Sequence, residues 1–69
     1  MGSIQWVYAN GSSWVTLDTL AQQHIESLWS YNSSSWIQTQ SFRCPVYVDI
    51  GQMLLMCNNV SYSIARRRT

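Results

Sequence analysis

The chain has 69 residues, of which 46% are apolar and only 10% are charged, and its formal net charge at pH 7 is +1. This length allows one small domain, and so high an apolar fraction excludes a disordered chain. The weak charge excludes general nucleic-acid binding, which needs several phosphate contacts, and the lack of an apolar run of ~18 residues excludes a membrane-spanning helix.

The first residues predict a strand after a short leading segment. We interpret residues 1–3 as a start codon and cloning scar without structure, and residues 4–68 as a single domain. Residues 4–8 alternate with the period of two that is typical of a strand, so we expect Trp6 and Tyr8 on one face. For Tyr8 two interpretations stay open, a wall of a cleft or a half-buried strand residue.

A turn and a second strand follow. Asn10-Gly11 supplies the positive φ angles of a hairpin, although the two serines that come next favour a longer loop. The returning strand covers residues 14–17. Because tryptophan is the largest apolar side chain, we expect Trp6 and Trp14, on consecutive strands, to be pillars of the core.

The next segment predicts the helix of the domain. Asp18 or Thr19 can cap its first turn, and the helix runs to about Trp29. Apolar residues recur at spacings of three and four and include Ile25, whereas Glu26 falls outside this stripe. In so charge-poor a domain we expect Glu26 to be structural, accepting a hydrogen bond from a tryptophan indole or from loop amides.

The C-terminal half predicts four further strands. They cover residues 36–42, 46–50, 53–57 and 60–67. In the third of them, Met53, Leu54, Leu55 and Met56 are expected to be core residues. A strongly curved antiparallel sheet, a half-barrel of about six strands wrapped around one α-helix, buries the most surface for these elements. We therefore predict an α+β fold.

The cysteine and histidine side chains favour free thiols and do not predict a metal site. Cys44 and Cys57 could in principle form a bridge, but the lack of a secretory signal favours free thiols in an intracellular protein of the nucleus or cytoplasm. A structural metal site needs about four ligands, and His24, the only histidine, is far from both cysteines. We expect His24 to be solvated or to form a hydrogen bond on the helix surface. Since no nucleophile–base pair, carboxylate dyad or glycine-rich phosphate loop is present, we predict a binding domain without cofactor rather than an enzyme.

The order and spacing of these residues resemble a WWE domain, a family named for two tryptophans and a glutamate. The resemblance covers nearly the whole chain and is carried by Trp6, Trp14, the pair Ile25-Glu26, the strand Val46 to Ile50, Met53, and the closing strand Ile64 to Arg67. It implies a half-barrel fold and a place within an ADP-ribosyltransferase or a ubiquitin ligase. The arginine-ended tail is also similar to the first of paired WWE domains in CCCH-zinc-finger ADP-ribosyltransferase-like proteins.

The resemblance also implies a function. Several family members bind the iso-ADP-ribose unit of poly(ADP-ribose), or the terminal ADP-ribose, in a cleft at one end of the half-barrel. There the adenine stacks on aromatic rings, while arginine, glutamine and backbone amides hold the phosphates. The expected partners are ADP-ribosylated proteins and a neighbouring domain of the same chain. The residues expected to bind the ligand are Tyr8, Tyr47, Gln52, Tyr62 and Arg66.

Several positions of the expected cleft depart from the family pattern. Val46 stands where good binders carry a second tyrosine, Leu55 replaces a glutamine, and Tyr62 replaces an arginine. Two functions therefore stay open: an ADP-ribose-binding module with a partly degenerate pocket, or a degenerate copy that acts in protein–protein interaction or domain packing. For Arg66 the alternatives are a phosphate ligand at the cleft mouth and part of a solvated tail.

Overall fold

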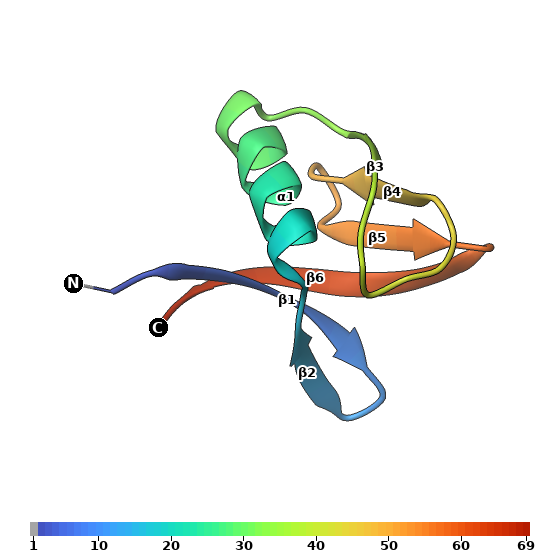
Figure 1. Ribbon diagram of the computed structural model, residues 1–69, viewed down its shortest axis with the longest axis horizontal. Helices are drawn as coiled ribbons and strands as arrows, with labels where there is room; N and C mark the ends of the chain where they lie inside the picture. The colour runs from blue at the N-terminus through green and yellow to red at the C-terminus, as the bar shows by residue number, and fades with distance from the viewer. Residues whose placement is uncertain (1) are drawn as a thin grey trace.

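Six strands and one helix follow one another along residues 2–69, which are the residues that the computed structural model describes (Figure 1). In chain order they are β1 (Ile4–Asn10), β2 (Ser13–Thr16), α1 (Thr19–Tyr31), β3 (Ser35–Ile37), β4 (Val46–Asp49), β5 (Leu54–Cys57) and β6 (Val60–Arg68). Neighbouring strands are antiparallel, in the order β2-β1-β6-β5-β4-β3, and the sheet does not close on itself. The predicted α+β fold, one helix with a six-stranded antiparallel sheet, is confirmed for this part of the chain.

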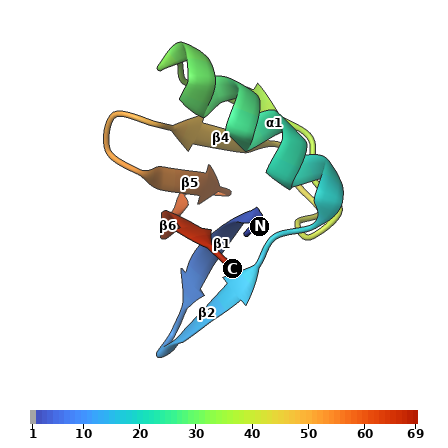
Figure 2. The ribbon, with the colours of Figure 1, turned by 90° about the vertical axis from the view of Figure 1, so that its left-hand side faces the viewer.

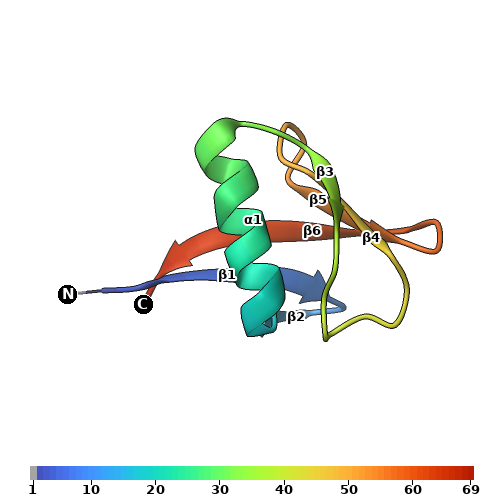
Figure 3. The ribbon, with the colours of Figure 1, turned by 45° about the horizontal axis from the view of Figure 1, so that its top comes forward.

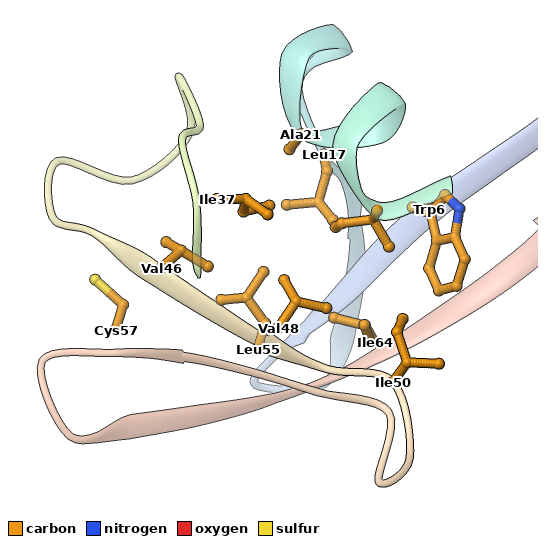
Figure 4. Packing of buried hydrophobic residues seen from close by; sticks show 11 residues of the cluster. Trp6, Leu17, Ala21, Ile37, Val46, Val48, Ile50, Leu55, Cys57 and Ile64 are labelled. Carbon is orange, nitrogen blue, oxygen red and sulfur yellow. The ribbon is translucent and has the colours of Figure 1, made fainter. Parts of the chain in front are cut away.

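The helix α1 packs across one face of the sheet, as Figure 2 and Figure 3 show, and it contacts β1 and β3. We call the face that carries α1 the inner face and the opposite one the outer face. The core lies between α1 and the inner face (Figure 4). Its members are Trp6, Leu17, Ala21, Ile25, Ile37, Val46, Val48, Ile50, Leu55, Cys57 and Ile64.

Both ends of α1 are capped. Asp18 Oδ2 accepts a hydrogen bond of 3.1 Å from the Ala21 amide, which satisfies one of the open donors of the first turn. At the other end Asn32 has a left-handed φ of 52°, and its amide donates to carbonyls of the last turn. The helix ends at Tyr31, slightly beyond its predicted end, because the asparagine cap rather than the apolar spacing stops it.

The β1–β2 hairpin turns more tightly than the sequence predicts. Asn10 pairs with Ser13, so the turn consists of Gly11 and Ser12 instead of a longer loop. Gly11 has a φ of 65°, a conformation that glycine adopts without steric cost. Ser12 therefore belongs to the turn, and Ser13 begins the strand β2.

Trp14 is not a pillar of the core, contrary to the prediction. Residues that pair across two strands share a face, and Trp14 pairs with Ala9. Ala9 lies three residues after Trp6 on the same strand, so the two side chains point to opposite faces. Trp6 is fully buried on the inner face, whereas Trp14 is 51% exposed on the outer face. The two-residue turn sets this register.

The strand predicted over residues 36–42 is shorter in the structure. β3 ends at Ile37, and the chain then forms a loop up to Pro45. Ser41 holds the loop against the start of α1, because its amide and its hydroxyl donate to Asp18 Oδ1 at 2.9 and 2.6 Å. These bonds bend the chain away from β4 where the alternating sequence pattern predicted continued pairing.

The apolar run in β5 is only partly core, which corrects the prediction for its other members. Leu55 is fully buried on the inner face, whereas Leu54 and Met56 are half-buried because alternate residues of a strand point to the outer face. Met53 is half-buried as well, and it precedes the strand with a left-handed φ of 56°. A run of apolar residues therefore does not mean burial on both faces here.

Cys44 and Cys57 form a disulfide, which corrects the prediction of free thiols. Their Cα atoms are 6.2 Å apart, within the ~4.4–6.8 Å range that a bridge requires. Cys44 lies just before β4 and Cys57 ends β5, so the bridge ties the loop after β3 to the β5–β6 turn. The prediction of free thiols was based on the expected reducing compartment, whereas the bridge depends on how the fold brings the two cysteines together.

The two ends of the described chain lie side by side. The Thr69 amide donates to the Ser3 carbonyl at 2.9 Å, and the two hydroxyls are 2.7 Å apart. Ser3 was expected to lie in a segment without structure. Instead, its hydrogen bond to Thr69 continues the pairing of β1 with β6. Met1 lies outside the described residues.

Candidate binding surface

The five predicted ligand residues occupy different parts of the fold. Tyr8 and Tyr62 lie together on the inner face, and Arg66 lies beside α1. Gln52 belongs to the β4–β5 turn, and Tyr47 lies on the outer face. The structure thus brings two of the five side chains into contact.

Tyr8 and Tyr62 form an aromatic cluster with Phe42. The ring centroids are 5.6 Å apart for Tyr8 and Tyr62, 5.1 Å for Tyr8 and Phe42, and 5.5 Å for Phe42 and Tyr62. Phe42 comes from the loop that Ser41 holds against Asp18, so the loop carries this ring to the tyrosines. The two tyrosines thus pack against a side chain of their own domain. No sequence pattern indicates Phe42, because the contact depends on the path of the loop.

Arg66 is held by Glu26. Its Nε and a terminal nitrogen donate to the two carboxylate oxygens at 3.0 and 2.8 Å, a paired geometry that is typical of strong arginine–carboxylate contacts. The guanidinium carbon also lies 5.3 Å from the centroid of the Trp29 ring. This guanidinium is engaged within the domain, which fits neither of the two interpretations left open for it, a phosphate ligand and a solvated tail.

Glu26 also accepts a hydrogen bond from the indole of Trp6. The Nε1 atom donates to Oε1 at 2.8 Å, so the expected bond between this glutamate and a tryptophan indole is confirmed. Hydrogen bonds from Arg66 lower the pKa of the Glu26 carboxyl, burial opposes them, and the Trp6 indole adds to the lowering. The same pairing raises the pKa of Arg66. The carboxylate therefore joins the core tryptophan to the last strand.

Gln52 closes the β4–β5 turn. Its amide donates to Asp49 Oδ1 at 3.1 Å, and its side-chain nitrogen donates to Asp49 Oδ2 at 3.2 Å. On the other side of the turn, the Ser34 hydroxyl accepts from the Ile50 amide at 2.9 Å. The carboxamide of Gln52 thus bonds to the turn that carries it.

Tyr47 belongs to a row of side chains that crosses the outer face. Directly paired residues of β3, β4, β5 and β6 place Trp36, Tyr47, Met56 and Ser61 side by side. Trp36 is 66% exposed, and its ring centroid lies 5.4 Å from that of Tyr47. We call Trp36, Tyr47 and Met56 the outer-face row. Sequence reasoning missed Trp36, although its alternation with the buried Ile37 was a signal that it faces outward.

A groove of about 610 Å³ runs along the outer-face row. Its other walls are Pro45, Asn58 and Asn59. A second groove, of about 620 Å³, lies on the other side of Trp36 and combines Arg43 and His24 with Phe42. His24 is exposed there, as predicted. Trp36 and Pro45 line both grooves, and Trp36 is the aromatic residue that they share.

Residues 2–69 contain no group of three or more histidine, cysteine, aspartate or glutamate side chains with the geometry of a metal site. Over the same residues, the helix falls short of the length and hydrophobicity that crossing a bilayer requires. Neither a protein-family model, nor a curated protein, nor a solved structure matches this chain.

Proposed function

We propose that this domain is a non-catalytic interaction module that binds a protein partner through its outer face. The observation that carries the proposal is the outer-face row, in which Trp36 and Tyr47 stand in contact on an open sheet. Tryptophan and tyrosine are the residues that most often dominate the energy of protein interfaces. An exposed indole beside a half-buried methionine, Met56, makes an apolar patch of the kind that marks interaction sites.

The inner-face contacts support this proposal against nucleotide binding. Phe42 packs against both tyrosines that the ADP-ribose prediction needed, and Glu26 engages the arginine. A pyrophosphate requires free cationic or amide donors, and an adenine requires a free aromatic face. A ligand there competes with contacts that the domain already makes.

We further propose that the chain is a WWE domain whose sheet is curved as a half-barrel. The order and spacing of the residues named in the sequence analysis support the family, and one helix packed across one face of an open six-stranded antiparallel sheet is compatible with a half-barrel. By the same resemblance, the parent protein is an intracellular ADP-ribosyltransferase or ubiquitin ligase.

ADP-ribose recognition is the second candidate function, because one groove carries suitable chemistry. Arg43, His24 and Thr39 line the groove of about 620 Å³ together with the rings of Trp36 and Phe42. A cation, hydrogen-bonding groups and aromatic faces are what a base linked to a pyrophosphate requires. This groove differs from the cleft that the sequence resemblance implied.

Calorimetric titration with ADP-ribose and with iso-ADP-ribose separates the two candidates. We expect no heat of binding at high micromolar ligand. Saturable binding that is lost in Tyr8→Ala supports the cleft of the family, and binding lost in Arg43→Gln supports the second groove. Tyr31→Ala is the matched control for the tyrosine, because Tyr31 is 79% exposed at the end of α1.

The interaction module itself is tested by selecting binders from a random peptide library on the immobilised domain. We expect selected peptides to lose affinity for Trp36→Ala and to keep it for Trp14→Ala. Both tryptophans are largely exposed, so neither change is expected to unfold the domain. Peptides that bind equally well to both variants contradict the proposed surface.

A further inference from the structure

The groove beside the outer-face row has an uncharged lining. Its walls are Trp36, Pro45, Tyr47, Met56, Asn58 and Asn59. Its volume of about 610 Å³ is within the ~300–1,000 Å³ of sites that enclose a small ligand or a few residues. Because no side chain of the lining carries a charge, the groove has nothing to neutralise a phosphate or an acidic or basic side chain. The complementary ligand is uncharged where it contacts these residues.

The two aromatic rings of the groove form a notch rather than a platform. The ring planes of Trp36 and Tyr47 are inclined at 70° with centroids 5.4 Å apart. Rings this close are in direct edge-to-face contact, so no ligand fits between them, but a compact apolar ring packs in the angle between the face of one and the edge of the other. The notch geometry therefore favours a proline ring over a sugar or a nucleobase.

The opposite wall supplies hydrogen-bond donors. Asn58 and Asn59 are both exposed and form the β5–β6 turn, with left-handed φ values of 51° and 67°. Two positive φ angles are typical of the tight type I′ turn, which holds both residues in one conformation. The Cys44–Cys57 bridge joins this turn to Pro45, so the two walls are linked covalently next to the groove.

From these features we infer that the groove binds a proline-rich peptide in the polyproline II conformation. Such a peptide has no internal hydrogen bonds, so its carbonyls need outside donors, and carboxamides and an indole N–H provide them. Its proline rings need apolar notches, and aromatic-lined grooves recognise polyproline II in this way. The inference rests on the proposed function, since it names the occupant of the same surface.

The test uses a capped, uncharged proline-rich peptide and a capped glycine–serine peptide of equal length. Proton–nitrogen correlation spectra resolve the indole N–H signals of the four tryptophans, which tryptophan-to-phenylalanine variants assign. We expect the proline-rich peptide alone to shift the Trp36 signal and to leave the Trp14 signal in place. Trp36→Ala is expected to weaken binding at least about tenfold, as truncation of an interface tryptophan typically does, and Trp14→Ala is expected to leave the affinity unchanged.

Other results overturn the inference in distinguishable ways. A Trp36 shift with the glycine–serine peptide, or with a library-selected peptide lacking proline, overturns the choice of proline and leaves the interaction module standing. A shift produced by a neutral oligosaccharide overturns the choice of a peptide. A shift that follows protein concentration alone assigns the groove to a second copy of the chain. If no peptide of either kind and no selected binder moves Trp36, the proposed function fails too.

Discussion

The carboxamide of Gln22 pairs with the backbone of Trp6 as a neighbouring strand does. Its Oε1 accepts from the Trp6 amide at 2.7 Å, and its Nε2 donates to the Trp6 carbonyl at 3.1 Å. The strand β2 pairs with β1 only from Val7 onward. The Leu17 amide still donates to the Trp6 carbonyl at 3.0 Å, but the Trp6 amide is left to the helix side chain. A buried peptide group without a partner is costly, and Gln22 removes that cost.

Replacing Gln22 by leucine is expected to destabilise the domain by about 1–3 kcal/mol, because the buried amide of Trp6 then has no acceptor. Urea unfolding followed by tryptophan fluorescence measures the loss. Gln23→Leu is the matched control, since Gln23 is exposed on the same helix and is expected to change stability by no more than about 0.5 kcal/mol. Equal effects of the two variants contradict the backbone-pairing role.

Trp6 and Trp14 are expected to differ strongly in their contribution to stability. Trp6→Ala removes a fully buried ring and should cost about 3–5 kcal/mol, enough to unfold so small a domain. Trp14→Ala changes a half-exposed outer-face residue and should cost less than about 1 kcal/mol. Thermal unfolding by circular dichroism compares them. A similar loss in both variants argues for a register in which both indoles are buried.

Asp18 is expected to make the domain sensitive to acid. Burial raises the pKa of this carboxyl, but hydrogen bonds from Ser41 and from the amides of Gln40, Ala21 and Ser41 outweigh it and lower the pKa to about 2. The unfolded chain binds the proton more tightly. The contribution of Asp18 to stability is therefore complete above pH ~4 and is lost as the pH falls toward 2.

Melting temperatures measured from pH 5 to pH 2 check this expectation against Asp18→Asn. Asparagine caps a helix about as well as aspartate, so the variant keeps the cap and loses the titrating charge. We expect a shallower decline of stability for the variant than for the parent chain. Curves of equal slope indicate that Asp18 has no part in the acid response.

The disulfide is expected to leave no reactive thiol in protein purified without reductant. Thiol labelling under denaturing conditions should find none before reduction and both cysteines after it. A bridge that closes a loop of this size, 13 residues in sequence, stabilises by roughly 3 kcal/mol, so reduction should lower the urea midpoint clearly. Two labelled thiols before reduction contradict the bridge, and fit the reducing nucleus or cytoplasm that the sequence predicts.

Local patterns were sufficient to predict the elements and their order. Each of these patterns spans only a few consecutive residues. They are the period of two in β1, the capping aspartate and the apolar spacing of α1, and they predicted both the strands and the helix. The bond between Trp6 and Glu26 was predicted for a different reason, since a buried indole N–H needs an acceptor in a chain with few charges.

Features that depend on pairing between distant residues were not predictable. Trp14 lies on the outer face because the β1–β2 turn is shorter than the two serines after Gly11 indicate. A register shift of one residue moves every side chain of a strand to the opposite face of the sheet. The contact between Phe42 and Tyr8 depends on the path of the loop after β3. The hydrogen bonds of the Gln22 side chain to the backbone of Trp6 are not indicated by any sequence periodicity. The predicted ligand residues came from a resemblance in sequence order, and order alone does not say which face carries a side chain.

The contact between Ser3 and Thr69 has a consequence for protein engineering. Since these residues are hydrogen-bonded to each other, a short linker can join them, and new termini can be opened between Gly11 and Ser12 in the exposed hairpin tip. In such a circular permutant every strand keeps its neighbours in the sheet. Only the covalent link between β1 and β2 in the hairpin turn is lost. The same closeness lets the domain be inserted as a cassette into a surface loop of a host protein without pulling the host's loop ends apart.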